Sequence, residues 1–138
     1  MKRLLSAVLV VCLLIGCMSI GVSAVSESAG DNSRYTGLVH MNASLSISDL
    51  GRAVVSVSAS LRDGYKAQMH VDLHQEGMST SSVPKTWDIS IAEGGEPWGG
   101  VWYVYSGYLY YATVTLDVYT TGGTYVETIT LDSNAVYY

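Results

Sequence analysis

From residue 39 onward, apolar side chains return at every second position, and this period of two constrains the fold more than any other feature of the chain. The first series consists of Val39, Met41, Ala43, Leu45 and Ile47, and the second of Ala53, Val55, Val57, Ala59 and Leu61. Serine fills most positions between them. Successive side chains of a β-strand point to opposite faces, whereas a helix repeats its apolar positions every three or four residues. The pattern therefore predicts strands with one buried and one solvated face.

Turn sequences separate further strands of the same kind. Turns are predicted at 49–52 and 62–64, and Gly122-Gly123 is the predicted centre of a hairpin. Further strands are expected at 67–73, 87–91, 101–105 (with both faces partly covered), 108–118 and 125–131, with loops at 75–85 and 93–100 and a short terminal strand within 134–138. About seven strands separated by turns, without a helical period, are typical of an antiparallel β-sandwich.

One local motif narrows the prediction to an immunoglobulin-like sandwich. In such domains a tyrosine near the start of the sixth strand lies two residues before a small inward position, and its hydroxyl bonds back to the backbone. Tyr110 and Ala112 have this spacing. Trp87 is a candidate core residue, although it does not lie on the third strand, where that fold usually keeps a tryptophan. We therefore expect an all-β, immunoglobulin-like antiparallel β-sandwich of about seven strands over residues 35–138.

The first residues have the pattern of an export signal. Lys2 and Arg3 precede an apolar run from Leu4 to Ile15, which is too short to span a bilayer. Val22-Ser23-Ala24 is a small-residue cleavage site, so residues 1–24 are predicted to be a signal peptide and 25–34 a flexible, Ser- and Gly-rich leader. The mature chain would then be secreted, without a transmembrane span.

A second processing site competes with the first. Leu14-Ile15-Gly16-Cys17 resembles a bacterial lipobox, in which Cys17 would be lipidated and would anchor the protein at the outer face of the cell membrane. Release after Ala24 is favoured because the segment stays apolar beyond Cys17. That release also removes both cysteines, so no disulfide is expected in the mature chain.

Charge and motif content argue against several classes of function. The chain has 7 Lys and Arg against 12 Asp and Glu, so it offers no basic stripe for nucleic acid and little attraction to an anionic membrane. Neither a Gly-x-Ser-x-Gly elbow, a Walker loop nor a His-Glu-x-x-His motif occurs. Glu93 and Glu96 share a Gly-rich segment, which is a poor environment for raising the pKa of a carboxyl group. We therefore expect neither an enzyme nor a cofactor.

Two groups of residues are candidates for ligand contacts. His70, Asp72 and His74 lie on one face of one strand and are candidate metal ligands, although the two histidines would be about 13 Å apart. A solvated polar face is the alternative for these three. Trp98, Tyr111 and Tyr119 are candidate ligand-binding residues, because rigid aromatic side chains make protein contacts and stack on sugar rings. Structural use of the same aromatics is the alternative, since the chain has no Phe.

With the export signal set aside, the order of motifs over residues 34–138 resembles a group of small exported proteins of unknown function from Gram-positive gut bacteria of the clostridial kind. The motifs are Arg34-Tyr35-Thr36, Leu45-Ser46-Ile47, Gly51, Leu73-His74-Gln75, Trp87, Gly107-Tyr108-Leu109-Tyr110, Val118-Tyr119 with Gly122-Gly123, Glu127-Thr128 and Tyr137. The resemblance implies export and a β-sandwich, and it transfers no active residues. His74 and the segment 93–100 depart from the group's pattern.

These observations favour a non-catalytic binding or interaction module outside the cell, whose partner is a glycan or a protein. A secreted bacteriocin-like or toxin-like factor and a surface metal binder are the alternatives.

Overall fold

The computed structural model describes residues 34–138. The predicted signal peptide, Cys17 and most of the predicted leader lie outside the described residues. All elements are strands: β1 (Leu38–Ile47), β2 (Arg52–Leu61), β3 (Tyr65–Glu76), β4 (Ser81–Ile91), β5 (Glu96–Tyr103), β6 (Leu109–Thr120), β7 (Tyr125–Asp132) and β8 (Val136–Tyr137). In this part of the chain, no helix is long and apolar enough to cross a membrane.

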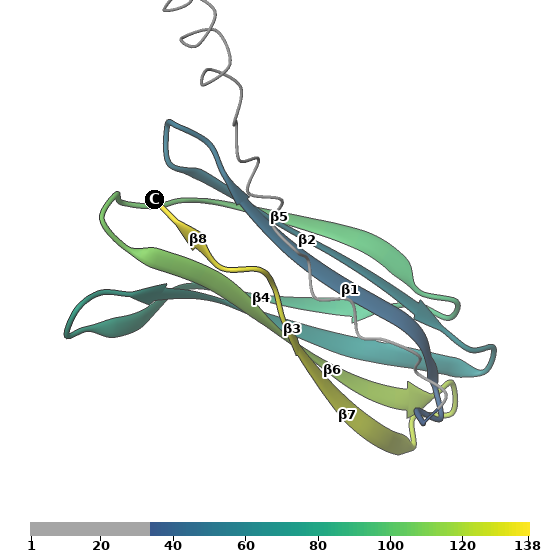
Figure 1. Ribbon diagram of the computed structural model, residues 1–138. Helices are drawn as coiled ribbons and strands as arrows, with labels where there is room; N and C mark the ends of the chain where they lie inside the picture. The colour runs from purple at the N-terminus through teal and green to yellow at the C-terminus, as the bar shows by residue number, and fades with distance from the viewer. Residues whose placement is uncertain (1–33) are drawn as a thin grey trace, which may run out of the picture.

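The strands form two antiparallel sheets that pack face to face (Figure 1). One sheet has the order β1-β2-β5, and the other has the order β4-β3-β6-β7, with the short β8 paired to β6. This order is that of an immunoglobulin-like sandwich with one change, because β4 pairs with β3 rather than with β5. The predicted fold class is therefore confirmed, including the short terminal strand.

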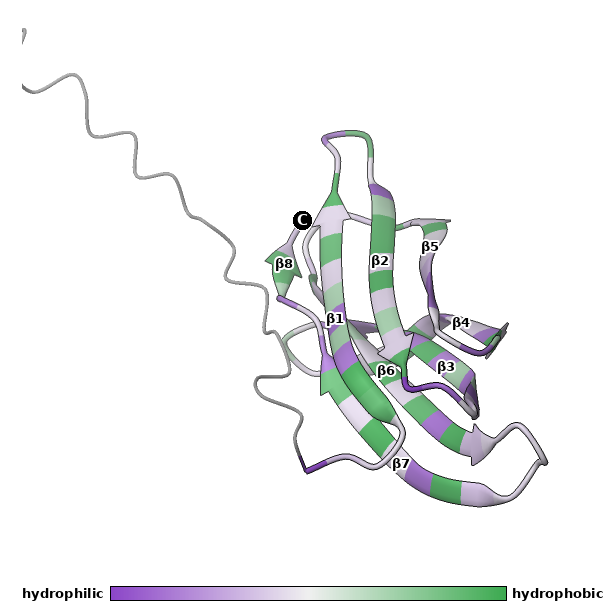
Figure 2. Cartoon of the chain, turned by 90° about the vertical axis from the view of Figure 1, so that its right-hand side faces the viewer, coloured by the Kyte–Doolittle hydropathy of each residue, from purple (hydrophilic) through white to green (hydrophobic). Residues whose placement is uncertain are grey.

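The period of two in the sequence becomes the inner and outer faces of the sheets. Bands of high and low hydropathy alternate along the strands (Figure 2). The inward set is almost fully buried and contains Met41, Leu45, Val55, Met69, Val71, Leu73, Val114, Leu116 and Val118. Burial of each such side chain is worth about 1.5–3 kcal/mol relative to exposure, so the core itself holds the two sheets together without a disulfide.

Tyr110 forms the expected corner at the start of β6. Its hydroxyl donates to the backbone oxygen of Tyr105 at 2.7 Å, and also to Oε1 of Gln75 at 3.1 Å. The ring is fully buried, and Ala112 two residues later is buried as well. Burial raises the pKa of Tyr110, which keeps its hydroxyl protonated as the donor. The prediction made from the Tyr110–Ala112 spacing is confirmed.

Two predicted loops are shorter than the sequence indicated. β3 continues to Glu76 and β4 begins at Ser81, so only a tight turn remains of the loop expected at 75–85. The loop expected at 93–100 was also wrong, because strand pairing resumes at Glu96 and includes both Gly99 and Gly100. Gly100 is required there by packing, since a Cβ atom would lie 2.4 Å from the ring of Trp98.

Candidate functional site

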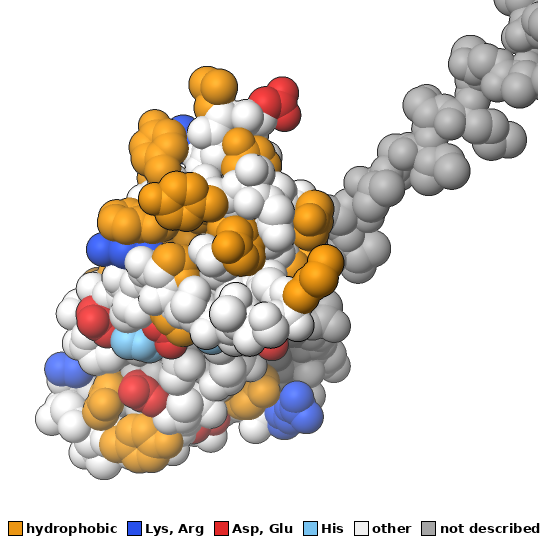
Figure 3. All heavy atoms as spheres, turned by 90° about the vertical axis from the view of Figure 1, so that its left-hand side faces the viewer, with side chains coloured by type: hydrophobic (Ala, Val, Ile, Leu, Met, Phe, Trp, Pro, Cys, Tyr) orange, Lys and Arg blue, Asp and Glu red, His pale blue; other side chains and the backbone are white. Residues whose placement is uncertain are grey.

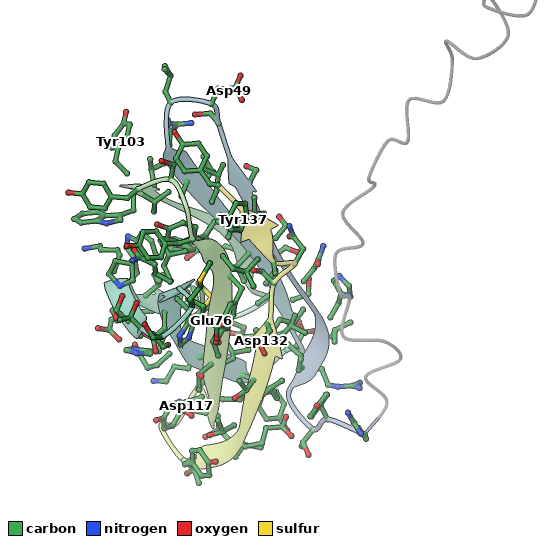
Figure 4. The ribbon with its side chains drawn as sticks, turned by 60° about the vertical axis from the view of Figure 1, so that its left-hand side comes forward. Asp49, Glu76, Tyr103, Asp117, Asp132 and Tyr137 are labelled. Carbon is green, nitrogen blue, oxygen red and sulfur yellow. The ribbon has the colours of Figure 1, made fainter. Side chains whose placement is uncertain are left out.

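Three exposed aromatic side chains lie within four residues at the end of β5 and just beyond it. Trp102 is 40% exposed, Tyr103 is 68% exposed and Tyr105 is 79% exposed. We call these three residues the β5 aromatic surface. Figure 3 shows hydrophobic side chains gathered at this end of the molecule, and Figure 4 shows Tyr103 pointing away from the sheets. The strand at 101–105 was predicted to have both faces partly covered, whereas β5 ends at Tyr103 and the side chains of Val101, Trp102 and Tyr103 are all exposed.

The position of β5 explains why its aromatic residues reach solvent. Trp102 lies opposite Ala53, which faces the core, whereas Tyr103 lies opposite Arg52, which faces solvent. At the edge of the sandwich the opposing sheet no longer covers the inner face, so Trp102 is only partly buried. Both faces of β5 therefore present an aromatic ring at this end.

A lysine from the other sheet completes this surface. The Nζ atom of Lys85 on β4 lies 5.1 Å from the ring centroid of Trp102 and 5.6 Å from that of Trp87. Such ammonium–ring contacts contribute about 0.5–1 kcal/mol at exposed sites and hold the side chains in place. The surface therefore combines flat aromatic groups with one fixed positive charge.

Trp98, one of the predicted ligand-binding residues, has a structural position instead. Its ring meets the ring of Trp87 edge to face, with centroids 5.5 Å apart. Both rings are half-buried and pack against the core between β4 and β5. Trp98 thus closes the side of the sandwich on which the β5 aromatic surface is built.

Tyr111 and Tyr119 lie on a different surface, the outer face of the five-stranded sheet. Tyr111 stacks flat on His74 at 4.6 Å between centroids, and its hydroxyl donates to Glu76 Oε1 at 3.2 Å. Tyr119 packs edge to face against Tyr125 at 5.8 Å. The structure therefore does not bring Tyr111 and Tyr119 together with Trp98.

His70 is the centre of a small charge network on the same outer face. Its Nδ1 atom lies 2.6 Å from Oδ1 of Asp88, which is directly opposite on β4. Its Nε2 atom lies 3.3 Å from Oδ1 of Asp72, whose oxygen also accepts a hydrogen bond from Thr86 at 2.6 Å. The hydrogen bond to Asp88 is the main reason why the pKa of His70 is raised. Both ring nitrogens face carboxylate oxygens, an arrangement that suits the protonated imidazolium.

The charge network predicts a pH-dependent contribution to stability. Because the folded-state pKa of His70 is raised, its stabilisation is complete below the unfolded value of 6.5 and is lost as the pH rises through the folded value. His70→Gln should therefore destabilise the protein at pH 5.5 and have almost no effect at pH 9. The imidazole is 45% exposed, so the largest difference should stay below about 1 kcal/mol. Urea unfolding of both proteins across this range measures it, and an equal difference at every pH would contradict it.

The predicted metal ligands do not converge. His70 is bound to Asp72 and Asp88, whereas His74 lies further along β3 and stacks on Tyr111. Within residues 34–138, no group of three or more His, Cys, Asp or Glu side chains is arranged to hold a metal ion. The spacing along an extended strand keeps the two histidines apart, as the sequence analysis anticipated.

The paired acidic residues Glu93 and Glu96 have been separated by the turn. Glu93 Oε1 accepts a hydrogen bond from the Gly64 backbone at 2.5 Å, so it ties the turn between β4 and β5 to the turn between β2 and β3. Glu96 lies on β5 opposite Ala59 and is exposed. Glu93 therefore has a structural role in connecting two turns.

The sequence analysis overlooked Trp102, Tyr103 and Tyr105 as candidate site residues. The available signal was the apolar run 101–105, which does not alternate and follows two glycines. A run of this kind is equally consistent with a buried strand. Only the position of β5 at a sheet edge distinguishes the two.

No protein-family model, no curated protein and no solved structure matches this chain. The resemblance to small exported clostridial proteins therefore stays a prediction.

Proposed function

We propose that this protein is an exported, non-catalytic binding module that holds an extracellular glycan or protein through the β5 aromatic surface. The observation that carries the proposal is the exposure of three aromatic side chains within four residues, with Trp102 and Tyr103 at the end of the edge strand β5 and Tyr105 just beyond it. Export is supported by Lys2 and Arg3 before the apolar run and by the small-residue site that ends at Ala24.

The chemistry of the β5 aromatic surface fits recognition. Exposed tyrosine and tryptophan provide large, stiff contact areas that lose little entropy on binding, and tyrosine adds a hydroxyl group. A β-sandwich fixes these side chains before the ligand arrives, which lowers the cost of association. Lys85 adds an ammonium group that can bind an oxygen of the ligand. By contrast, the outer face of the five-stranded sheet uses its polar groups largely on one another.

A ligand screen with matched variants tests the proposal. Wild-type protein is applied to arrays of cell-wall and host glycans and to surface proteins, and the affinity of each ligand found is measured by calorimetry. Tyr105→Ala should weaken binding of the ligand at least about tenfold, because a tyrosine at the centre of an interface contributes about 1–2 kcal/mol to the free energy of binding. Its melting temperature should not change, since Tyr105 contributes only its backbone oxygen to the Tyr110 corner.

Two control variants separate the possible surfaces. Tyr125→Ala removes a tyrosine that is 55% exposed at the start of β7, in the other sheet, and should leave binding intact. Tyr111→Ala combined with Tyr119→Ala tests the surface that the sequence analysis favoured. A ligand lost only in the Tyr111 and Tyr119 variant would move the binding site to the five-stranded sheet and contradict the proposal for β5.

A further inference from the structure

The free edge of β5 carries unpaired backbone groups at regular spacing. The ladder to β2 includes the bond from Leu61 N to Gly94 O at one end and the bond from Val104 N to Gly51 O, 2.9 Å, at the other. In an antiparallel pair, alternate residues turn both backbone groups toward the partner strand. The even-numbered residues of β5 therefore direct their backbone N–H and C=O groups toward β2. Gly99, Val101 and Tyr103 direct theirs away from β2, toward the free edge. In the topology of the described residues, β5 pairs with no strand other than β2.

Two other outer edges of the sandwich, β1 and β4, carry features that oppose strand addition. On β1, the side chain of Asn134 binds both the N–H and the C=O of Leu45, each at 2.9 Å. β4 contains Pro84, Lys85 and Asp88. Proline, charged residues and covering side chains are the usual protection of edge strands.

The second half of β5 lacks these features. From Gly99 to Tyr103 it contains no proline, no charged residue and no bulge, and only Pro97 interrupts the donors of the first half. Figure 2 shows β5 as the outermost strand of its sheet. The protein is acidic, with a net charge of −5, so a second copy is repelled over most of its surface. The uncharged segment 99–103 is where two copies can approach without that repulsion.

The sequence of this segment is complementary to itself. When two copies run antiparallel about a twofold axis at Val101, Gly99 of each lies opposite Tyr103 of the other, and Gly100 opposite Trp102. A Cβ atom on Gly99 would have nothing nearer than the Val55 oxygen at 3.8 Å, so the space above this glycine is open. A cross-strand aromatic ring that covers such a glycine is a known way of fixing strand register.

We propose that β5 pairs antiparallel with β5 of a second copy of this chain about a twofold axis at Val101, which joins two three-stranded sheets into one of six strands. The interface is isologous, because the same segment is used by both copies. The backbone groups of Gly99, Val101 and Tyr103 then find partners. The paired segment includes Trp102 and Tyr103, two of the three residues of the β5 aromatic surface, whereas Tyr105 lies beyond it and remains for the ligand proposed above.

Sedimentation of charge variants tests the pairing. The purified wild-type protein should sediment as a dimer at micromolar concentration. Val101→Lys places two like charges directly opposite each other and should weaken the dimer at least about a hundredfold, since such juxtaposition costs several kcal/mol. Val101 is already 41% exposed, so the fold tolerates lysine there. Ser58→Lys adds the same charge to an exposed position of the neighbouring strand β2 and should leave the dimer intact.

Cysteine cross-linking tests the register. In a chain whose Cys12 and Cys17 are replaced by serine, Val101→Cys should form a covalent dimer under mild oxidation, because the two Cα atoms would be about 5.5 Å apart. Tyr103→Cys should not, because it faces Gly99 rather than itself. A wild-type protein that stays monomeric, a dimer that survives Val101→Lys, or cross-linking at Tyr103 in place of Val101 would each overturn the proposal. A wild-type protein that is monomeric but binds the ligand would overturn the pairing and leave the proposed function intact.

Discussion

Gly95→Ala is expected to destabilise the sandwich by about 3–5 kcal/mol, although the change adds only one methyl group. Gly95 has a φ of 80°, in the left-handed region that side chains with a Cβ atom avoid. The added Cβ atom would also lie 2.0 Å from the backbone oxygen of Ala59. That oxygen belongs to β2, so relief of the clash requires a shift of the turn away from the sheet.

The neighbouring residue provides a matched control for Gly95→Ala. Gly94 has nearly the same φ, 84°, but a Cβ atom there would meet nothing within 4 Å. Gly94→Ala should therefore cost only the conformational strain, about 1–2 kcal/mol. Urea unfolding of both variants isolates the effect of the clash with Ala59. Equal losses in the two variants would contradict the close approach of the turn to β2.

The fold was predictable because each strand repeats a local rule. Val55, Val57 and Ala59 point inward at every second position, and a shift by one residue would expose all of them. The Tyr110–Ala112 spacing then identified the corner of an immunoglobulin-like sandwich, which the hydrogen bond to Tyr105 confirms. These signals are local in sequence, so they can be detected without knowledge of the tertiary arrangement.

The candidate site was less predictable because it depends on which strands lie at the edges. Tyr111 and Trp102 are both aromatic residues on strands, yet the first stacks on His74 while the second reaches solvent at the end of β5. The two glycines before Val101 indicated a loop, whereas Gly100 in fact admits the rings of Trp87 and Trp98. Contacts between β4 and β5 join different sheets, and no period in the sequence reports them.

Tyr110→Ala is expected to cause a loss of stability of about 3–5 kcal/mol, comparable to that of Gly95→Ala, for a different reason. Tyr110 has the largest fully buried side chain of the sandwich. Its ring also packs edge to face against Tyr108, with centroids 6.4 Å apart. Removal of the ring leaves a cavity in the core, and it removes the hydroxyl that donates to the Tyr105 oxygen.

Tyr110→Phe separates the hydroxyl from the ring. It keeps the packing and removes the hydrogen bonds to Tyr105 and Gln75, so it should cost about 1–3 kcal/mol. Tyr111→Phe is the matched control, because its hydroxyl bonds only to Glu76 on the outer face, and it should cost less than about 1 kcal/mol. Thermal and urea unfolding of the three variants give the comparison. If Tyr110→Phe were as stable as the wild type, the corner hydrogen bond would not stabilise the fold, and the connection from β5 to β6 would be held by ring packing alone.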